Sequence, residues 1–507
     1  MAKVYLVGAG PGDPELITVK GRRLLESADA VLFDHLAPAA LLSFAPAHAE
    51  RIYVGKKKAD HVYSQDEICA MLIERARRGW NVVRLKGGDP FLFGRGGEEA
   101  EALAEAGVPF EIVPGVTAPL GIAAYTGVPL THREHTSAVT FVTGHAASAI
   151  DWGRVGMSET LVIYMGLTAF AEIARELIAR GRDRHTPAMA VRWGTRPDQQ
   201  TLTGTLATLP AIVEEQGMKP PATIVVGEVV RLREKLNWYE RLPLFGQRIV
   251  VTRASGQAGA LSSRLEALGA GVIEMPAIEI QPAADYAPLD QAIGQLAAYD
   301  WLIFTSVNGV RFFMERLDRS RADLRSLRAR ICAIGPATRA AIEALHLKVD
   351  LMGTEYVAES LLAAFESHRL EGARMLLPRA AVARDVIPVE LARRGAQVDV
   401  VEAYRTVLPA GAAARAGEIL GAGRKPDWIA FTSSSTVQNF VSVAPPGALA
   451  GVRVASIGPV TTRAARDLGI EPAVEARAFT IDGLVEAILA FSNPEMSLEP
   501  GNDSNTR

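Results

Sequence analysis

The sequence predicts an α/β protein made of two consecutive halves, each of which is two-lobed. Short runs rich in valine, isoleucine and leucine alternate with helical patterns along the chain, which is typical of layered α/β folds. The pattern changes at residues 242–247, where a polar and aromatic stretch gives way to a new strand. The half that follows contains an internal duplication. These observations predict a two-lobed αβα fold followed by a duplicated, two-lobed α/β fold.

The composition is that of a globular enzyme. The chain has 507 residues, of which 49% are hydrophobic and 22% charged, and its formal net charge is −3. No stretch approaches the roughly 20 apolar residues of a membrane helix and no basic excess is present, so we expect neither a membrane nor a nucleic-acid partner. The 2 cysteines are too few for a disulfide framework. A strand begins directly after the first residues and leaves no room for a signal peptide, so we expect a cytoplasmic protein.

We expect the first half to span residues 1–245 and to hold nine strands. They are predicted at residues 4–7, 30–33, 51–54, 82–85, 110–113, 139–142, 161–164, 188–191 and 223–226. Nine strands over this length indicate two αβα lobes rather than a single sheet. Pro114-Gly115, after the fifth strand, is the natural hinge, which places the lobes at about 1–114 and 115–245. A ligand is expected in the cleft between them.

The second half, residues 246–492, repeats three blocks in the same order at offsets of 123 to 127 residues. The repeated blocks are 300–308 with 427–435, 330–338 with 453–461, and the stretch around 251–253 and Gly269 with 377–379 and Gly395. The period is too long for a solenoid and predicts two similar α/β lobes with a cleft between them. Residues 493–507 are short, polar and aperiodic, and we expect a disordered tail.

Two glycine-rich loops follow predicted strands of the first half, at residues 8–13 and 87–99. Glycines after a strand let the backbone turn sharply and approach a ligand closely. Neither loop has the spacing of the dinucleotide fingerprint or of a phosphate-binding loop, so no NAD site is expected. The first loop ends in the carboxylate of Asp13, which suits a neutral or cationic small molecule.

Asp34 and Lys56 each follow a predicted strand of the first half, at the edge of the sheet where α/β enzymes carry their sites. The pair forms a candidate acid and base, and the alternative is that such residues belong to solvated turns. The histidines have no metal-binding spacing, and no metal is expected.

In the duplicated half, Phe-Thr-Ser and Ile-Gly-Pro-x-Thr each follow an apolar strand where a helix should start. Serine and threonine there are good N-caps. The functional alternative is that two lobes present helix N-termini and hydroxyls to a ligand with many carboxylates. Tyr404 likewise is either a packed ring or a proton donor to a leaving group.

Five segments of the first half resemble uroporphyrinogen-III C-methyltransferase across residues 1–245. They are residues 4–14, residues 83–91 with the highly specific Gly87-Gly88-Asp89-Pro90-Phe91, residues 113–117, Pro129-Leu130-Thr131-His132-Arg133, and Tyr164-Met165-Gly166. Residues 246–492 resemble uroporphyrinogen-III synthase on the duplicated layout, the two repeated motifs, and the Tyr-x-Thr at Tyr404. A fusion is chemically sensible because the product of the synthase is the substrate of the methyltransferase.

The first resemblance implies S-adenosyl-L-methionine as co-substrate and methylation of uroporphyrinogen III at C2 and then C7, giving precorrin-2 for sirohaem or cobalamin. The implied cofactor contacts are Pro11, Gly87, Gly88, Asp89, Leu92, Thr117, Ala118, Met165 and Gly194. Asp34 matches the family's proton acceptor and Lys56 its proton donor. Arg84, Lys86 and Arg133 are the candidate partners of substrate carboxylates. The family is commonly dimeric, so we expect a homodimer through residues 1–245.

The second resemblance implies closure of hydroxymethylbilane with inversion of ring D, with Tyr404 assisting departure of the hydroxyl. The candidate substrate contacts are Thr305, Ser306, Asn308, Gly335, Thr338, Thr432, Ser433, Gly458 and Thr461. Two alternatives stay open. The methyltransferase half acts on a later corrin precursor, or the second half only holds a tetrapyrrole. With no NAD fingerprint, the oxidation and iron insertion that complete sirohaem are expected in other proteins.

Overall fold

The computed structural model describes residues 2–55, 63–145, 150–253, 259–353, 358–383, 385–421 and 423–493. The chain divides into two compact units, Met1–Arg248 with Arg264–Val272 and Ser492–Arg507, and Ile249–Ser263 with Ile273–Phe491. Lys56, and the expected tail from residue 494 onward, lie outside the described residues. No helix within the described ranges is long and apolar enough to cross a membrane.

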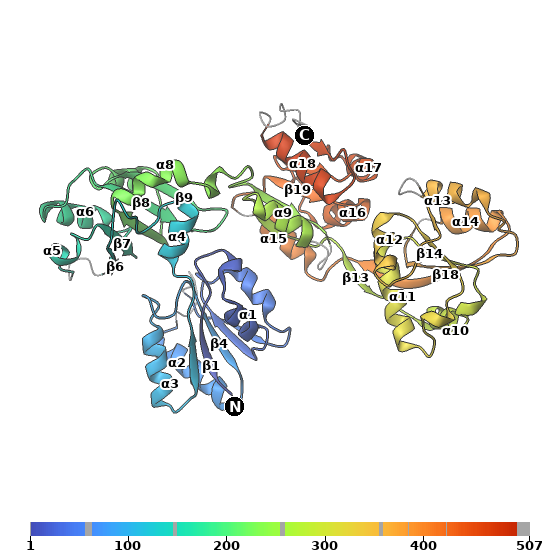
Figure 1. The fold of residues 1–507 in the computed structure, drawn as a ribbon, viewed down its shortest axis with the longest axis horizontal. Coiled ribbons are helices and arrows are strands. Elements are labelled where there is room, and N and C mark those ends of the chain that lie inside the picture. The colour runs from blue at the N-terminus through green and yellow to red at the C-terminus, as the bar shows by residue number, and fades with distance from the viewer. Residues whose placement is uncertain are drawn as a thin grey trace, which may run out of the picture. The chain divides into compact units, whose positions relative to one another are not determined.

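The first lobe of the first unit is a five-stranded parallel sheet in the order β3-β2-β4-β1-β5. Its elements are β1 (Val4–Gly8), α1 (Val19–Leu25), β2 (Ala30–Phe33), β3 (Glu50–Tyr53), α2 (Gln65–Arg77), β4 (Val82–Lys86), α3 (Gly96–Glu105) and β5 (Phe110–Val113). Helices α2 and α3 pack on one face of the sheet and α1 on the other (Figure 1). All five strands were expected from the sequence.

The second lobe is a mixed five-stranded sheet in the order β6-β7-β10-β8-β9. Its elements are α4 (Ala118–Thr126), β6 (Val139–Thr143), α5 (Trp152–Val155), β7 (Thr160–Tyr164), α6 (Phe170–Ala179), β8 (Pro187–Arg192), β9 (Gln200–Thr205), α7 (Leu209–Glu215), β10 (Ala222–Val226) and α8 (Arg233–Leu236). Strands β6 and β7 form a parallel pair of neighbours. Strand β10 is antiparallel to both β7 and β8, and β9 is antiparallel to β8. Helices α5, α6 and α7 pack on one face, and α4 packs on the other.

Strand β9 was missed by the sequence analysis, which placed nine strands in the first half, whereas the described residues of that half form ten. Its sequence, Gln-Thr-Leu-Thr-Gly-Thr, is polar and contains an internal glycine, and its residues are half-buried or exposed. It lies at the edge of the sheet and pairs with β8 on one side only. An edge strand with little buried surface lacks the apolar pattern that identifies a strand from sequence.

The second unit contains two sheets, in the orders β12-β11-β19-β20-β21 and β13-β18-β17-β14-β15-β16. The strands are β11 (Arg248–Val251), β12 (Gly271–Glu274), β13 (Glu279–Pro282), β14 (Trp301–Phe304), β15 (Arg330–Ala333), β16 (Leu351–Met352), β17 (Arg374–Ala380), β18 (Gln397–Val407), β19 (Trp428–Phe431), β20 (Arg453–Ser456) and β21 (Val474–Glu475). The helices are α9 (Gly259–Ala267), α10 (Ala287–Gly294), α11 (Val307–Arg319), α12 (Pro336–Glu343), α13 (Ala358–Ala364), α14 (Val386–Arg393), α15 (Ala412–Gly421), α16 (Ser434–Val443), α17 (Pro459–Asp467) and α18 (Ile481–Ser492).

Each lobe of the second unit combines strands from both sequence repeats. The first repeat supplies β11 and β12 to one sheet and β13, β14, β15 and β16 to the other, and the second repeat supplies the remaining strands. Strand β11 pairs with β19 of the other repeat, and β14 pairs with β17. The lobes are therefore similar in strand order, but neither corresponds to one repeat, because the chain crosses between sheets in the middle of each repeat.

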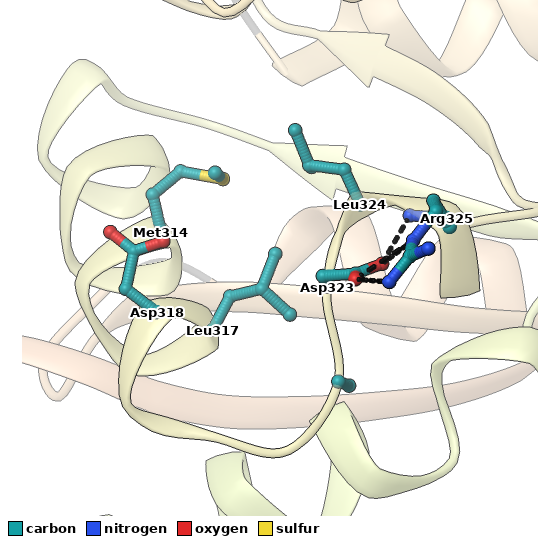
Figure 2. Close-up of a pocket in the computed structure, with 7 residues that line it drawn as sticks. Met314, Leu317, Asp318, Asp323, Leu324 and Arg325 are labelled. Carbon is teal, nitrogen blue, oxygen red and sulfur yellow. Dashed lines mark hydrogen bonds and ion pairs between the residues drawn. The ribbon is translucent and has the colours of Figure 1, made fainter.

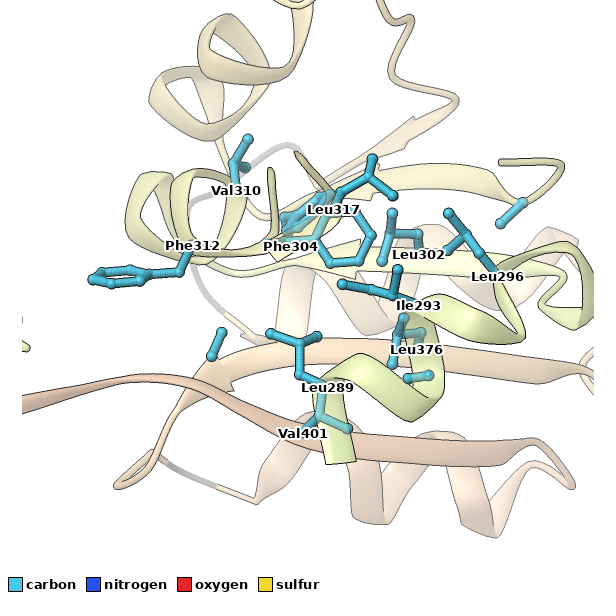
Figure 3. Packing of buried hydrophobic residues seen from close by; sticks show 14 of the residues in the cluster. Leu289, Ile293, Leu296, Leu302, Phe304, Val310, Phe312, Leu317, Leu376 and Val401 are labelled. Atoms are coloured by element: carbon cyan, nitrogen blue, oxygen red, sulfur yellow. The ribbon is translucent and has the colours of Figure 1, made fainter. Parts of the chain in front are cut away.

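The larger of these lobes has a hydrophobic core on each face of its sheet. On one face, α10 and α11 pack against β14, β15, β17 and β18 through Leu289, Phe304, Phe313 and neighbouring residues (Figure 3). On the other face, α13 and α14 pack through a second cluster that includes Trp301. Strands β14 and β15 are buried along almost their whole length for this reason, and they are the apolar strands that the sequence places before two of the repeated motifs.

Gly8, Gly88 and Gly115 allow three backbone segments of the first unit to meet at the expected hinge. A Cβ atom on Gly115 would overlap the Gly88 carbonyl oxygen and lie 2.7 Å from the Gly8 Cα atom.

We predict that Gly115→Ala lowers the stability of the folded protein by about 1–3 kcal/mol, because backbone atoms cannot yield as a side chain can. Thermal or denaturant unfolding measures the change. Gly97→Ala in α3 is the matched control, since its Cβ meets open space, and unfolding identical to wild type in both variants would contradict the prediction.

Candidate functional site

The two glycine-rich loops of the first unit are hydrogen-bonded to each other. The Ala9 amide donates to the Lys86 carbonyl at 2.7 Å, and Gly10 and Gly88 exchange backbone hydrogen bonds of 3.3 and 2.7 Å. Gly10 and Gly88 have φ angles of 80° and 69°, in the left-handed region that favours glycine. Because β1 and β4 are adjacent parallel strands, their loops leave the same edge of the sheet and pair there.

Asp89 joins the second loop to the start of the second lobe. One carboxylate oxygen accepts the Phe91 amide at 2.8 Å, and the other accepts the Gly115 amide at 3.0 Å. The Asp89 side chain therefore fixes the turn of its own loop and the hinge between the lobes.

The expected cofactor residues converge on the first turns of α4. A Cβ on Gly88 would lie 3.5 Å from the Ala118 amide nitrogen, while Cβ atoms on Gly121 and Gly194 would overlap Pro11 and Ile122. Leu92, from the first lobe, packs with Ala118 against the core of the second lobe. Gly87 abuts Leu36, two residues beyond Asp34.

Thr117 precedes α4 without capping it through its side chain. Its hydroxyl instead lies 2.7 Å from the Tyr164 hydroxyl in a buried hydrogen bond. The Tyr164 ring contacts Phe93 of the second glycine-rich loop at a centroid distance of 4.8 Å. Met165 follows Tyr164 with a φ of 50° and is 53% exposed, so its thioether is accessible.

Asp13 does not have the free carboxylate that the sequence analysis used to argue for a cationic ligand. Its Oδ1 atom accepts the Glu15 amide at 2.8 Å as an N-cap, and its Oδ2 atom accepts the Tyr125 hydroxyl. Its own amide donates to Thr195 Oγ1. That argument was wrong, because the carboxylate holds the first loop to the second lobe. The expectation of a neutral or cationic ligand has a better basis in the cations of the two loops. Among the described loop residues no cation is free to bind an anion, because Arg95 is paired with Glu98.

Asp34 lies at the carboxyl end of β2, as expected. Its Oδ1 atom accepts the Leu36 amide at 2.9 Å, and its Oδ2 atom lies 3.4 Å from Arg84 Nη2. The side chain is 23% exposed, so it is accessible to a ligand while one oxygen is held by a buried arginine. Lys56, its expected partner, lies outside the described residues.

Arg84 and Lys86 do not extend toward a ligand as the sequence analysis expected. Each is 4% exposed, and both are ion-paired with the buried carboxylate of Glu99, at 3.2 and 2.8 Å. Burial and the nearby Arg84 charge lower the pKa of Lys86. The reason is the position of both side chains under α3 rather than at the sheet edge. Arg133, the third cation, is exposed.

His132, Glu134 and His135 come together on the turn that carries Arg133, although the sequence spacing indicated scattered histidines. One potential ligand atom from each of the three lies within 4.8 Å of the others. The two imidazole rings are stacked at a centroid distance of 4.8 Å, and the His132 Nδ1 atom accepts the Glu134 amide.

In the second unit, both expected serines are helix N-caps. Ser306 Oγ accepts the Gly309 amide at 3.0 Å at the start of α11, and Ser433 Oγ accepts the Thr436 amide at 3.3 Å at the start of α16. Gly335 and Gly458 precede α12 and α17 without a side-chain cap. Each lobe thus presents two adjacent helix N-termini at the carboxyl edge of its parallel strands. This geometry satisfies the N-cap interpretation and leaves the ligand interpretation as a prediction.

The remaining expected contacts divide by burial. Thr305, Asn308 and Thr432 are partly exposed beside these N-termini. Thr338 and Thr461 are 4% exposed within α12 and α17, so the structure does not present their hydroxyls to a ligand.

Tyr404 combines the two interpretations that the sequence left open. Its ring is 8% exposed and stacks on Phe312 at 5.7 Å with an interplanar angle of 13°. Its hydroxyl lies 2.9 Å from Ser306 Oγ, so two candidate residues meet at the start of α11. Burial raises the pKa of Tyr404, which keeps the phenol protonated and able to donate a hydrogen bond.

A surface hollow of about 440 Å³ at the end of α11 is unrelated to these candidates (Figure 2). It is lined by Met314, Leu317, Asp318, Ala322, Asp323, Leu324 and Arg325. Among its charged side chains, Arg325 is paired with Asp323. The hollow contains no residue expected at either site.

The sequence analysis did not identify Glu99, Tyr125 or Tyr164 as site residues, although their contacts organise the first site. Glu99 was treated as the end of a glycine-rich loop, although Ala100 and Leu103 continue its buried helical face. That spacing was the available signal. Tyr125 and Tyr164 act through contacts with residues distant in sequence, Asp13 and Thr117, and the sequence carries no local sign of these contacts.

Two family models match the chain. Residues 3–210 match the tetrapyrrole (corrin/porphyrin) methylases, and residues 259–486 match uroporphyrinogen-III synthase HemD. The porphyrin biosynthesis protein HemD of Ruminiclostridium josui is 36% identical over 492 residues, covering 96% of this chain and 97% of that protein.

Further relatives match one half. A siroheme synthase of Pseudomonas putida (strain W619) is 52% identical over 242 residues, or 47% of this chain, which spans about half (52%) of that relative's length. A crystal structure of uroporphyrin-III C-methyl transferase from Thermus thermophilus, complexed with S-adenyl homocysteine, is 42% identical and covers 46% of this chain and 100% of that one, with a TM-score of 0.40.

The two domain matches define a tetrapyrrole methylase joined to a uroporphyrinogen-III synthase. The full-length match shows that the chain belongs to the family of the Ruminiclostridium josui porphyrin biosynthesis protein HemD. The resemblance of each half, and their fusion, is confirmed.

Proposed function

We propose that this bifunctional enzyme closes hydroxymethylbilane to uroporphyrinogen III with inversion of ring D, and then methylates the product at C2 and C7 to give precorrin-2. The observation that carries the proposal is the match of both enzyme domains in one chain, together with the convergence of the expected cofactor residues on the start of α4. S-adenosyl-L-methionine is the proposed co-substrate, and it supplies an electrophilic methyl group when bound.

The described residues fit this co-substrate. The paired loops offer backbone at Gly87 and Gly88, and their described residues hold no free cation that would select a pyrophosphate. Met165, after β7 of the second lobe, adds an accessible thioether. Pro11, Asp89, Leu92, Thr117, Ala118 and Gly194 complete the proposed set. Holding the macrocycle carbon at attack distance from the methyl group supplies most of the rate.

Asp34 is the proposed base in the methyl transfer. When the pyrrole carbon gains a methyl group, the macrocycle gains a positive charge, and loss of one proton to the Asp34 carboxylate restores neutrality. Arg84 Nη2 lies 3.4 Å from the Asp34 Oδ2 atom and holds this oxygen in place. Lys56 is the proposed proton donor, and Arg133 is a proposed partner of substrate carboxylates.

In the synthase half, Tyr404 is the proposed donor to the departing hydroxyl of hydroxymethylbilane. Its buried hydroxyl is oriented by Ser306. The proposed substrate contacts are the exposed N-terminal groups beside Ser306, Gly335, Ser433 and Gly458, where free amides favour the substrate's carboxylates. We also propose a cytoplasmic homodimer formed through residues 1–245.

The first test incubates the full-length protein with hydroxymethylbilane and S-adenosyl-L-methionine, and separates the products by isomer and methylation state. We expect a dimethylated type III product, which requires both activities. Uroporphyrinogen I, formed by spontaneous closure, would show that the second half only holds a tetrapyrrole. Unmethylated type III product would contradict the methyltransferase assignment and favour a different macrocycle as substrate.

Asp34→Asn tests the base in the first half. We expect methyl transfer to fall by at least about 100-fold, within the usual contribution of a general base. Asparagine keeps the oxygen that accepts the Leu36 amide, so S-adenosyl-L-methionine affinity, measured by calorimetry, should stay unchanged. Asp29→Asn, before the amino end of the same strand, is the matched control. Turnover within twofold of wild type in Asp34→Asn would remove Asp34 from the mechanism.

Tyr404→Phe tests the second half. We expect cyclisation to type III product to slow by at least about tenfold, at the low end of acid and base contributions. Tyr299→Phe is the matched control, because Tyr299 is also buried in this lobe and its hydroxyl bonds to Asp399. Equal cyclisation rates for the two variants would leave Tyr404 as a packed ring.

A further inference from the structure

Glu99 is a fully buried carboxylate in the first turn of α3, next to the proposed methyl-transfer site. Its exposure is 0%, and its Oε1 atom accepts from Arg84 Nε at 3.2 Å, Lys86 Nζ at 2.8 Å and Gln65 Nε2 at 3.0 Å. Its Oε2 atom is buried with no hydrogen-bond partner among the described residues. Burying a carboxylate costs free energy, and the two neighbouring cations, Arg84 and Lys86, offset this cost for Glu99.

Three buried charges and the accessible Asp34 carboxylate form one cluster. Arg84 and Lys86 on β4 carry the two positive charges, and Glu99 on α3 and Asp34 after β2 carry the two negative charges. Cys69 on α2, together with Glu98 and Arg95 at the start of α3, are the other titratable groups nearby. The pair formed by Glu98 and Arg95 is exposed, so solvent screens it.

The Arg84 guanidinium connects Glu99 to Asp34. Its Nε atom donates to Glu99, its Nη1 atom to the Leu85 carbonyl at 3.1 Å, and its Nη2 atom to Asp34 at 3.4 Å. Because the guanidinium is planar, three separate acceptors fix its plane as well as its position. Without Glu99, the guanidinium loses the acceptor that holds it on the side away from Asp34.

We propose that Glu99 is a positioning residue for methyl transfer, which holds Arg84 so that Arg84 orients the Asp34 carboxylate for proton removal. This inference rests on the proposed role of Asp34 as the base. Glu99 itself is fully buried, so it acts through Arg84. Its second function is to balance the charge of Lys86, and the experiment must separate this structural role from the positioning of Arg84.

The test compares Glu99→Gln with Glu98→Gln in the full-length enzyme, using the pH profile of methyl transfer. Removal of the Glu99 charge leaves two buried cations and one carboxylate, Asp34, in the cluster, so the net charge of the cluster becomes more positive by one. The acid limb of kcat should therefore move to lower pH, and kcat should fall by at least about tenfold because the base is weaker and misoriented. KM for S-adenosyl-L-methionine should not change. Glu98→Gln, one residue earlier on the same helix turn, should match wild type.

The double variant Glu99→Gln with Lys86→Met separates the two roles and carries the test if the single variant does not fold. It removes one buried charge of each sign, so stability and the acid limb should return toward wild type. Under the proposal kcat stays reduced, because Arg84 still lacks its carboxylate partner. Full recovery of kcat in the double variant, or a wild-type profile in folded Glu99→Gln, would overturn the proposal.

Asp34→Asn measured alongside keeps this inference distinct from the proposed function. If Asp34→Asn is inactive while Glu99→Gln behaves as wild type, only the positioning role of Glu99 fails. If Asp34→Asn keeps its activity, the proposed base fails and the positioning role fails with it.

Discussion

The pairing of the two glycine-rich loops is the contact on which the first site depends. Gly10 and Gly88 exchange backbone hydrogen bonds, and Gly8, Gly88 and Gly115 bring three backbones closer than any side chain would allow. Asp89 then ties the second loop to the hinge at Gly115. These contacts join β1 and β4 of one lobe to α4 of the other, so residues from both lobes meet at the first turns of α4. A site built from backbone in this way needs little charged surface.

Charge in this unit is placed under the site instead of on it. Arg84 and Lys86 lie beneath α3 with Glu99. Asp34 is accessible, and it interacts with this group of charges through Arg84. A cluster that balances two positive charges with two negative charges avoids the large cost of an isolated buried ion. The pairing with Glu99 explains why the two cations expected to bind substrate are directed inward.

The second unit uses a different principle, because its duplicated sequence forms two sheets that each contain strands of both repeats. The pairing of β11 with β19 and of β14 with β17 means that neither repeat can complete a sheet alone. The equivalent helix N-termini at Ser306 and Ser433 are thereby carried to equivalent edges of two lobes. Tyr404 breaks this symmetry, since it reaches only Ser306.

The sequence by itself determined the α/β class, the buried strands and the two families, because apolar strands and glycine motifs are local patterns. It also indicated Asp34, which directly follows β2, and Tyr404, which the structure places inside the long strand β18. The tertiary structure alone decided the edge strand β9, the exchange of strands between repeats, and the partners of Asp13, Arg84 and Lys86. The physical reason is that hydrogen bonds and ion pairs depend on which distant segments meet. The pairs formed by Asp13 with Tyr125 and by Lys86 with Glu99 exist only after α3 and α4 have packed on their sheets.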